Sequence, residues 1–162
     1  MRRQHARFVA GNLFSGIISL NQNICALFFS HKVGFNPKYP MAFLTGDYLG
    51  YLYRYFLCDF GIPEHLTFDS YSSQAGRNNL FLKTFRKYDT EYHISSPCSA
   101  NENPEEGSIR EMKKIWYRIM YKNKFLERLW DYELVWISEI RNRYVSISRY
   151  ASGRTPLDYI NG

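Results

Sequence analysis

The first 46 residues of this chain contain neither aspartate nor glutamate. No carboxylate from this segment can therefore serve as a metal ligand. Cysteine is also scarce: Cys25, Cys58 and Cys98 are far apart, and no CxxC or His/Cys ligand spacing accompanies them. This scatter excludes a zinc site of the usual spacing and indicates a reducing compartment.

Long apolar runs, tandem repeats and low-complexity tracts are missing as well. No stretch reaches the roughly 18 apolar residues of a membrane span, so we expect no membrane insertion. The start MRRQHARFVAGNLFSGIISL joins a basic head to an apolar run, as a leader peptide does. Asn12 and Ser15 interrupt that run and no cleavage site follows, which favours a first core strand.

Aromatic and apolar residues are abundant, at 18% and 45% of the 162 residues. A chain of this length fits one domain that buries roughly two thirds of its unfolded surface, so we treat residues 1–162 as a single domain. The net charge of +6 and the pI of about 9.2 suit a polyanionic partner such as DNA, RNA or an acidic membrane surface. Many ordinary domains share this balance.

Hydrophobic patterning predicts three strands followed by a helix. The strands span about 8–18, 24–30 and 35–41, and their short connections indicate an antiparallel meander. Pro37 and Pro40 place the third strand at an edge. From Asp47 to Phe60 the apolar residues recur every three or four positions, which predicts a helix with Thr45 or Asp47 as its cap and Gly61 as its stop.

The second half of the chain alternates helix and strand before two final helices. The predicted elements are a strand at 65–68, a helix at 78–88, a strand at 91–94, a loop at 95–104, a helix through 109–119 and a helix from about 126 to 147. Five strands with flanking helices form a mixed α/β layered domain.

Two acidic positions stand out in this order. Asp69 ends an apolar strand, where α/β folds place ligand-binding residues, and Glu106 opens a later helix. Paired carboxylates repel each other unless a cation lies between them, and oxygen ligands favour Mg²⁺ or Mn²⁺. Such ions support phosphodiester chemistry. The alternative is structural: Asp69 is a helix cap or loop residue, and the acids at 102, 105 and 106 favour a helix N-terminus.

The segment from Gly107 to Lys124 is strongly basic. Its only acid is Glu111, against the cations Arg110, Lys113, Lys114, Arg118, Lys122 and Lys124. Because this helix lies next to a candidate metal site, we interpret it as a nucleic-acid-binding surface whose cations attract phosphates. Without a metal site nearby, the same basic residues would be interpreted as an ordinary solvent-exposed helix face.

At these residues the sequence resembles the integrase catalytic core of retroelements, most closely that of copia-type retrotransposon polyproteins. The matching pieces are GIPEHLTFDS, the SSP…N..E..IREMKK pattern, RLWDYELVWISEIRN and GRTPLDYING, which together cover nearly the whole chain. The resemblance implies the ribonuclease-H-like fold, a mixed five-stranded sheet flanked by helices. It also implies an intracellular protein, in the nucleus or cytoplasm, that acts on DNA as a multimer.

That family uses three acids, Asp, Asp and Glu, which bind Mg²⁺ or Mn²⁺ for 3′-end processing and strand transfer. Asp69 matches the second Asp and Glu106 the Glu, although the adjacent Glu105 competes for the latter role. Lys113 and Lys114 match basic positions that face DNA in the family, and Arg110 and Arg118 lie on the same helix.

The first acid is missing, because Gly11 stands at its position and Asn12 is the only nearby oxygen ligand. The loop SPCSANEN also departs from the family, and its upstream zinc-binding domain and downstream DNA-binding region are not in this sequence. We therefore expect a degenerate, inactive integrase core. The alternatives are a non-catalytic nucleic-acid-binding module and an assembly module that keeps the fold.

Overall fold

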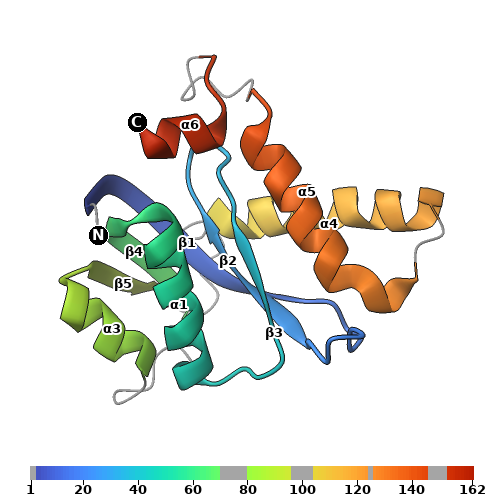
Figure 1. Cartoon of the computed structure of the whole chain (residues 1–162), viewed down its shortest axis with the longest axis horizontal. Coiled ribbons are helices and arrows are strands. Elements are labelled where there is room, and N and C mark those ends of the chain that lie inside the picture. Colours follow the sequence, from blue (N-terminus) through green and yellow to red (C-terminus); the bar gives the residue numbers. More distant parts are fainter. Residues whose placement is uncertain (1–2, 70–79, 96–103, 124–125, 146–152) are drawn as a thin grey trace.

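A five-stranded sheet in the order β3-β2-β1-β4-β5 separates two layers of helices (Figure 1). The computed structural model describes residues 3–69, 80–95, 104–123, 126–145 and 153–162. The elements are β1 (Arg3–Phe14), β2 (Cys25–Ser30), β3 (Lys38–Met41), α1 (Gly46–Phe60), β4 (Ile62–Asp69), α3 (Leu80–Tyr88), β5 (Glu91–Ser95), α4 (Pro104–Asn123), the 3-10 turn η1 (Glu127–Leu129), α5 (Trp130–Arg143) and α6 (Pro156–Asn161).

The predicted antiparallel meander is confirmed, with β3 as the edge strand that carries Pro40. The bounds of the first strand were predicted wrongly, because β1 ends at Phe14 rather than Ile18. Ser15 Oγ accepts a hydrogen bond from the backbone N–H of Ile17 at 3.1 Å, and Gly16 has a φ of 80°. This local turn takes the chain out of the sheet despite the apolar residues that follow.

The other half of the sheet is parallel. β1 pairs with β4 and β4 pairs with β5, so the carboxyl ends of these three strands lie at one edge. Ala10 pairs with Phe68, and Asp69 pairs with Ser95. β4 is longer than the predicted 65–68 because it begins directly after Gly61, the glycine that ends α1 with a φ of 91°.

One face of the sheet packs against α1 and α3. Thr45 caps α1, as predicted, since its side chain accepts a hydrogen bond from the backbone N–H of Tyr48. Phe56 of α1 stacks on Phe29 of β2 with ring centroids 4.1 Å apart. Of the apolar side chains predicted for α1, Phe60 is partly buried and the others are fully buried in this layer, namely Leu49, Leu52, Tyr53, Phe56 and Leu57.

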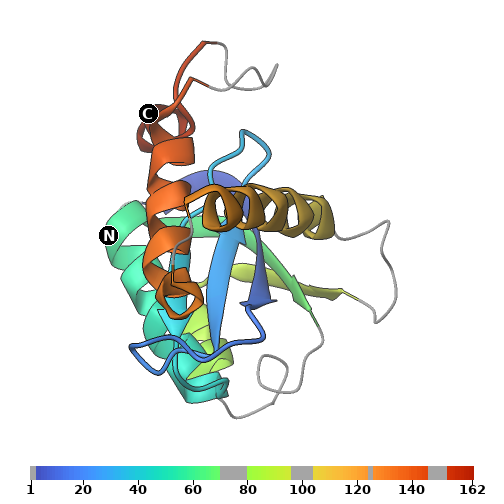
Figure 2. The same cartoon turned by 90° about the vertical axis from the view of Figure 1, so that its right-hand side faces the viewer.

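The other face packs against α4 and α5, which cross each other (Figure 2). α4 begins at Pro104, inside the predicted loop, since proline suits a first helical position. α5 ends at Arg143 rather than near 147, because Tyr144 is extended, with ψ of 142°. Leu126 and Tyr144 lie within the predicted helix but outside α5, and they are 57% and 70% exposed.

Buried polar contacts fix α5 to the segment that leads into β3. Asn142 Oδ1 accepts a hydrogen bond from the backbone N–H of Asn36 at 2.8 Å, and Ser138 Oγ donates to the Asn36 carbonyl. Lys38 Nζ donates to that same carbonyl at 3.1 Å and lies 4.9 Å from the centre of the Phe28 ring. These contacts satisfy a lysine that is only 6% exposed.

The short helix α6 was not predicted. Thr155 Oγ1 accepts a hydrogen bond from the backbone N–H of Asp158 at 3.0 Å, and Pro156 occupies the first turn. Threonine before proline is a helix-start signal that the motif GRTPLDYING contains. Ile160 joins the α1 layer and is 3% exposed.

Candidate catalytic positions and nucleic-acid interface

Gly11 and Asp69 occupy adjacent positions on neighbouring parallel strands. Each directly follows a member of the Ala10–Phe68 pair, Gly11 on β1 and Asp69 as the last residue of β4. On its other side Gly11 pairs with Phe28 of β2, so it lies in the middle of the sheet and is buried. The position that the resemblance gives to the first acid is therefore next to that of the second.

Strand alternation separates Gly11 from Asn12. Leu13 packs with Met112 of α4, whereas Ala10 belongs to the layer of α1, so odd positions of β1 belong to the α4 face. Asn12 pairs with Leu27, a residue of the α1 layer, and its Oδ1 is buried with no hydrogen-bond partner among the described residues. Asn12 is thus on the wrong face to replace a carboxylate at position 11.

Glu106 lies in the first turn of α4, two residues after Pro104. The backbone places Asp69 at the end of β4 and Glu106 at the start of the helix that covers β1, but the side chains of both acids lie outside the described residues. Elsewhere, the described part of the chain holds no group of three or more His, Cys, Asp or Glu side chains that could bind a metal ion.

The basic residues predicted for nucleic acid fall on the outer surface of α4. Arg110, Lys114 and Arg118 are exposed and, at intervals of four, form one ridge along the helix, while Lys113 is half-buried beside them. The buried face of α4 lies opposite and comprises Met112, Ile115, Trp116, Ile119 and Met120. All four predicted cations are therefore on one helix, and three of them are directly open to solvent.

One ion pair on α4 neutralises part of this positive charge. Lys114 Nζ is 3.1 Å from Glu111 Oε1, and this hydrogen bond and charge hold the pKa of Glu111 below its ordinary value. Both side chains are more than half exposed, so the pair contributes little to stability. A polyanion can displace Glu111 from Lys114 at small cost.

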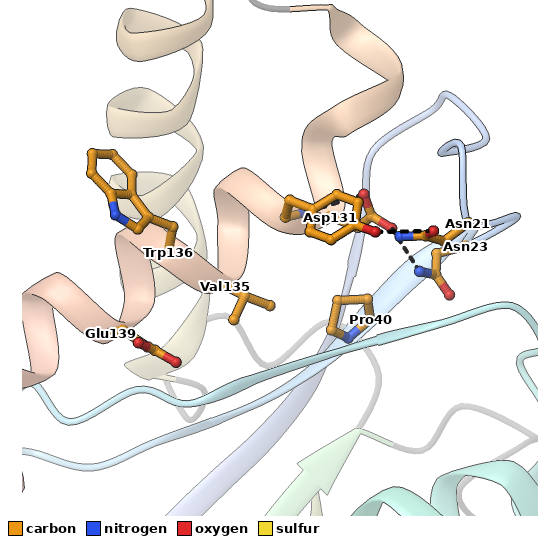
Figure 3. A pocket seen from close by; sticks show the side chains of 8 residues that line it. Asn21, Asn23, Pro40, Asp131, Val135, Trp136 and Glu139 are labelled. Atoms are coloured by element: carbon orange, nitrogen blue, oxygen red, sulfur yellow. Dashed lines mark hydrogen bonds between the residues drawn. The ribbon is translucent and has the colours of Figure 1, made fainter.

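Sequence reasoning missed a second polar site, at the N-terminal end of α5 (Figure 3). Asp131 is 2% exposed, and its Oδ2 accepts hydrogen bonds from Asn21 Nδ2 at 3.0 Å and Asn23 Nδ2 at 2.7 Å. Burial alone would raise the pKa of Asp131, but these amides and the backbone N–H of Tyr132 outweigh it and lower the pKa. Asp131 thus anchors the β1–β2 connection to α5.

A groove of about 360 Å³ lies beside this anchor, bounded by Pro40 and by Val135, Trp136 and Glu139 of α5 (Figure 3). Trp136 is 57% exposed. Because the carboxylate of Asp131 is already held by protein donors, we assign it a structural role rather than a chemical one.

A second cavity, of about 210 Å³, lies where β1, β4 and α6 meet. Its lining includes Arg7, His31, Lys32, Glu64 and Tyr159. The His31 ring is 6% exposed and its Nδ1 accepts a weak 3.4 Å hydrogen bond from the backbone N–H of Val33. Burial, with a smaller effect of Lys32, lowers the pKa of His31 to about 4, so this histidine is neutral at pH 7.

Comparison with solved structures identifies the fold. The chain matches the HTLV-2 integrase catalytic core domain, solved in complex with magnesium in a trimeric form, with a TM-score of 0.68 at 10% identity over 96% of this chain and 95% of that one. It also matches a simian T-cell lymphotropic virus intasome in complex with PP2A regulatory subunit B56 gamma, with a TM-score of 0.70 at 9% identity over all of this chain and 57% of that one.

No protein-family model and no curated protein matches the sequence. At these identities the structural likeness shows the fold alone, and that fold is the ribonuclease-H-like core of integrases. The predicted fold class, a mixed five-stranded sheet flanked by helices, is confirmed. Within the described residues, no helix is long and apolar enough to cross a bilayer.

Proposed function

We propose that this chain is an integrase core of copia-type retrotransposon origin that binds DNA but has lost catalysis. The observation that carries the proposal is the register of the parallel strands, in which Gly11 is the β1 neighbour of Asp69. In an Asp-Asp-Glu site the first acid belongs on this strand, and a glycine there offers no ligand atom.

The remaining donor set does not complete a metal site of that kind. Asp69 and Glu106 are the two acids that would hold Mg²⁺ or Mn²⁺, and Asn12 belongs to the opposite face of the sheet. Two separated carboxylates bind divalent ions more weakly than three, because each lost oxygen ligand must be replaced by water. We therefore assign Asp69 and Glu106 as surviving ligand positions and derive no reaction step from them.

The proposed DNA binding rests on the cations of α4. Arg110, Lys114 and Arg118 form an exposed row of positive charge, with Lys113 beside it, and the row extends along the helix that carries Glu106 in its first turn. Phosphate contacts of this type bind without regard to sequence and weaken steeply as salt rises. The trimeric form and the intasome of the structural neighbours support DNA as partner and assembly into a homo-oligomer. A location in the nucleus or cytoplasm is proposed from the sequence resemblance alone.

The test is Mn²⁺-dependent cleavage and joining of a branched DNA substrate, with the chain as written compared with Gly11→Asp. Gly11 lies within a paired strand and is not among the residues with positive φ, so its backbone suits an aspartate. We expect activity only from the substituted protein, and Gly11→Asn is the matched control that adds bulk without charge. Activity of the natural chain would contradict the loss of catalysis.

A second candidate function is a non-catalytic nucleic-acid-binding module in which Asp69 and Glu106 no longer bind metal, favoured by the intact basic row of α4 beside an incomplete set of acids. It predicts salt-sensitive DNA binding that is the same in EDTA and in Mn²⁺. Replacing Lys113 and Lys114 by glutamine should reduce the salt slope by about one to two. An unchanged salt slope would show that these two lysines do not contact DNA.

A further inference from the structure

Two tyrosines on the outer surface of α4 are largely exposed to solvent. Tyr121 is 89% exposed and Tyr117 is 58% exposed. The only ring contact described for Tyr117 is with its neighbour Trp116, at 4.8 Å between centroids. A large aromatic ring left in water contributes nothing to core packing, so these two side chains are available for a partner.

The tyrosines lie next to the row of cations. Tyr117 and Tyr121 are four residues apart and follow Lys113 along one ridge, and the neighbouring ridge is Arg110, Lys114, Arg118 and Lys122. Residues 114, 117, 118, 121 and 122 thus share one face of the helix, opposite the buried Met112, Trp116 and Met120. The aromatic ridge rises by about 6 Å between its two rings.

Alternating rings and cations fit single-stranded nucleic acid better than other partners. Cations track the phosphates while rings stack on successive unpaired bases, and this stacking is independent of sequence. Duplex DNA buries its base faces, so only the cations could contact it. A second copy of this chain would have to face four exposed cations with its own basic surface, which is electrostatically unfavourable.

We infer that the outer face of α4 binds unpaired nucleotides, with Tyr117 and Tyr121 stacking on bases and Arg118 and Lys122 contacting phosphates. This inference rests on the proposed DNA-binding function and specifies its ligand. It makes the second half of α4 the place where a single-stranded extension lies once its duplex has been bound near the start of the helix.

The experiment measures fluorescence anisotropy of the full chain with three probes: a labelled thymidine strand, a blunt duplex, and that duplex with an unpaired thymidine extension. The variants are Tyr117→Ala with Tyr121→Ala and, as matched control, Tyr117→Phe with Tyr121→Phe. Phenylalanine keeps the ring, so it should bind like the natural chain within about twofold.

We expect the alanine pair to weaken binding of the strand and of the extended duplex by about tenfold or more, and to leave the blunt duplex within about twofold. Equal affinity of natural chain and alanine pair for the single strand, with duplex binding retained, would overturn the stacking role while leaving the proposed function intact. Failure to bind any of the three probes would overturn both the stacking role and the proposed DNA-binding function. Loss of self-association in the alanine pair without loss of DNA binding would assign the face to a second copy and overturn the inference.

Discussion

Gly50 of α1 packs directly against Leu80, the first residue of α3. A Cβ on Gly50 would lie 2.7 Å from Leu80 Cγ and 2.8 Å from the Leu80 backbone carbon. Asp47 Oδ1 accepts a hydrogen bond from the Leu80 backbone N–H at 3.0 Å, which ties the start of α3 to the first turn of α1. Contact between the two helices thus depends on a glycine in a position where helix propensity alone disfavours it.

Gly50→Ala should destabilise the protein by about 1–3 kcal/mol. The gain of roughly 1 kcal/mol in helix propensity does not offset overpacking against backbone, which cannot move aside as a side chain can. Urea unfolding measures the change, with Cys58→Ala on the exposed side of the same helix as control. A variant as stable as the control would show that α3 shifts freely on α1.

Asn23→Ala should destabilise the protein by about 1–3 kcal/mol, because it removes the 2.7 Å hydrogen bond to the buried Asp131 carboxylate. The folded-state pKa of Asp131 is lowered, so its contribution is present above its unfolded pKa and is lost as pH falls through the folded value.

The measurement for Asn23→Ala is urea unfolding at pH 7 and at acid pH. The difference between natural chain and variant should shrink once Asp131 is protonated. A difference that stays constant with pH would mean that Asn23 acts through packing instead. Gln22→Ala, an exposed neighbour in the same connection, is the control.

Glu133 of α5 has the opposite pH dependence. It is 6% exposed and neither of its oxygens has a hydrogen-bond partner among the described residues. Burial raises its pKa, and Trp116 Nε1 reduces that effect from nearby without reaching hydrogen-bond geometry. The folded state therefore binds the proton more tightly than the unfolded state.

Stability should accordingly fall as pH rises from the ordinary glutamate value through the raised one. Glu133→Gln should remove this fall, which urea unfolding of both proteins over that range would measure. Parallel curves would show that the carboxylate is solvated in solution. Glu139→Gln, on the exposed side of α5, is the matched control.

His31 should make the protein sensitive to mild acid. Its pKa is about 4 in the folded state against 6.5 ordinarily, so the unfolded state binds more protons between these values. Stability should therefore decrease as pH falls from 6.5 to 4, by no more than about 3 kcal/mol.

Two measurements test the behaviour of His31. NMR titration of its ring should give a folded-state pKa of about 4 rather than the ordinary 6.5, and His31→Gln should flatten the acid limb of the stability curve. A ring that titrates near 6.5 would mean that Glu64 or solvent reaches the imidazole within the cavity formed with Arg7, Lys32 and Tyr159.

Many local features follow from the sequence itself. The cap at Thr45, the stop at Gly61 and the apolar spacing of α1 are local signals, so this helix was predicted to within one residue at its start. The same holds for β2 and β5, whose apolar or β-forming runs are short and bounded. The basic row of α4 also follows directly from its spacing, because positions four apart share a ridge on any helix.

Tertiary structure alone decided the rest. The parallel register that puts Gly11 beside Asp69 depends on pairing between strands more than 50 residues apart, which no local pattern encodes. β1 ends at a local turn, and α5 ends where Tyr144 is extended. Apolar residues continue past both ends, so the hydrophobic pattern alone does not reveal them. Packing also determines which aromatic residues are core: Trp116 and Tyr117 are adjacent in sequence, but only the tyrosine faces solvent, because the sheet and α5 cover just one side of α4.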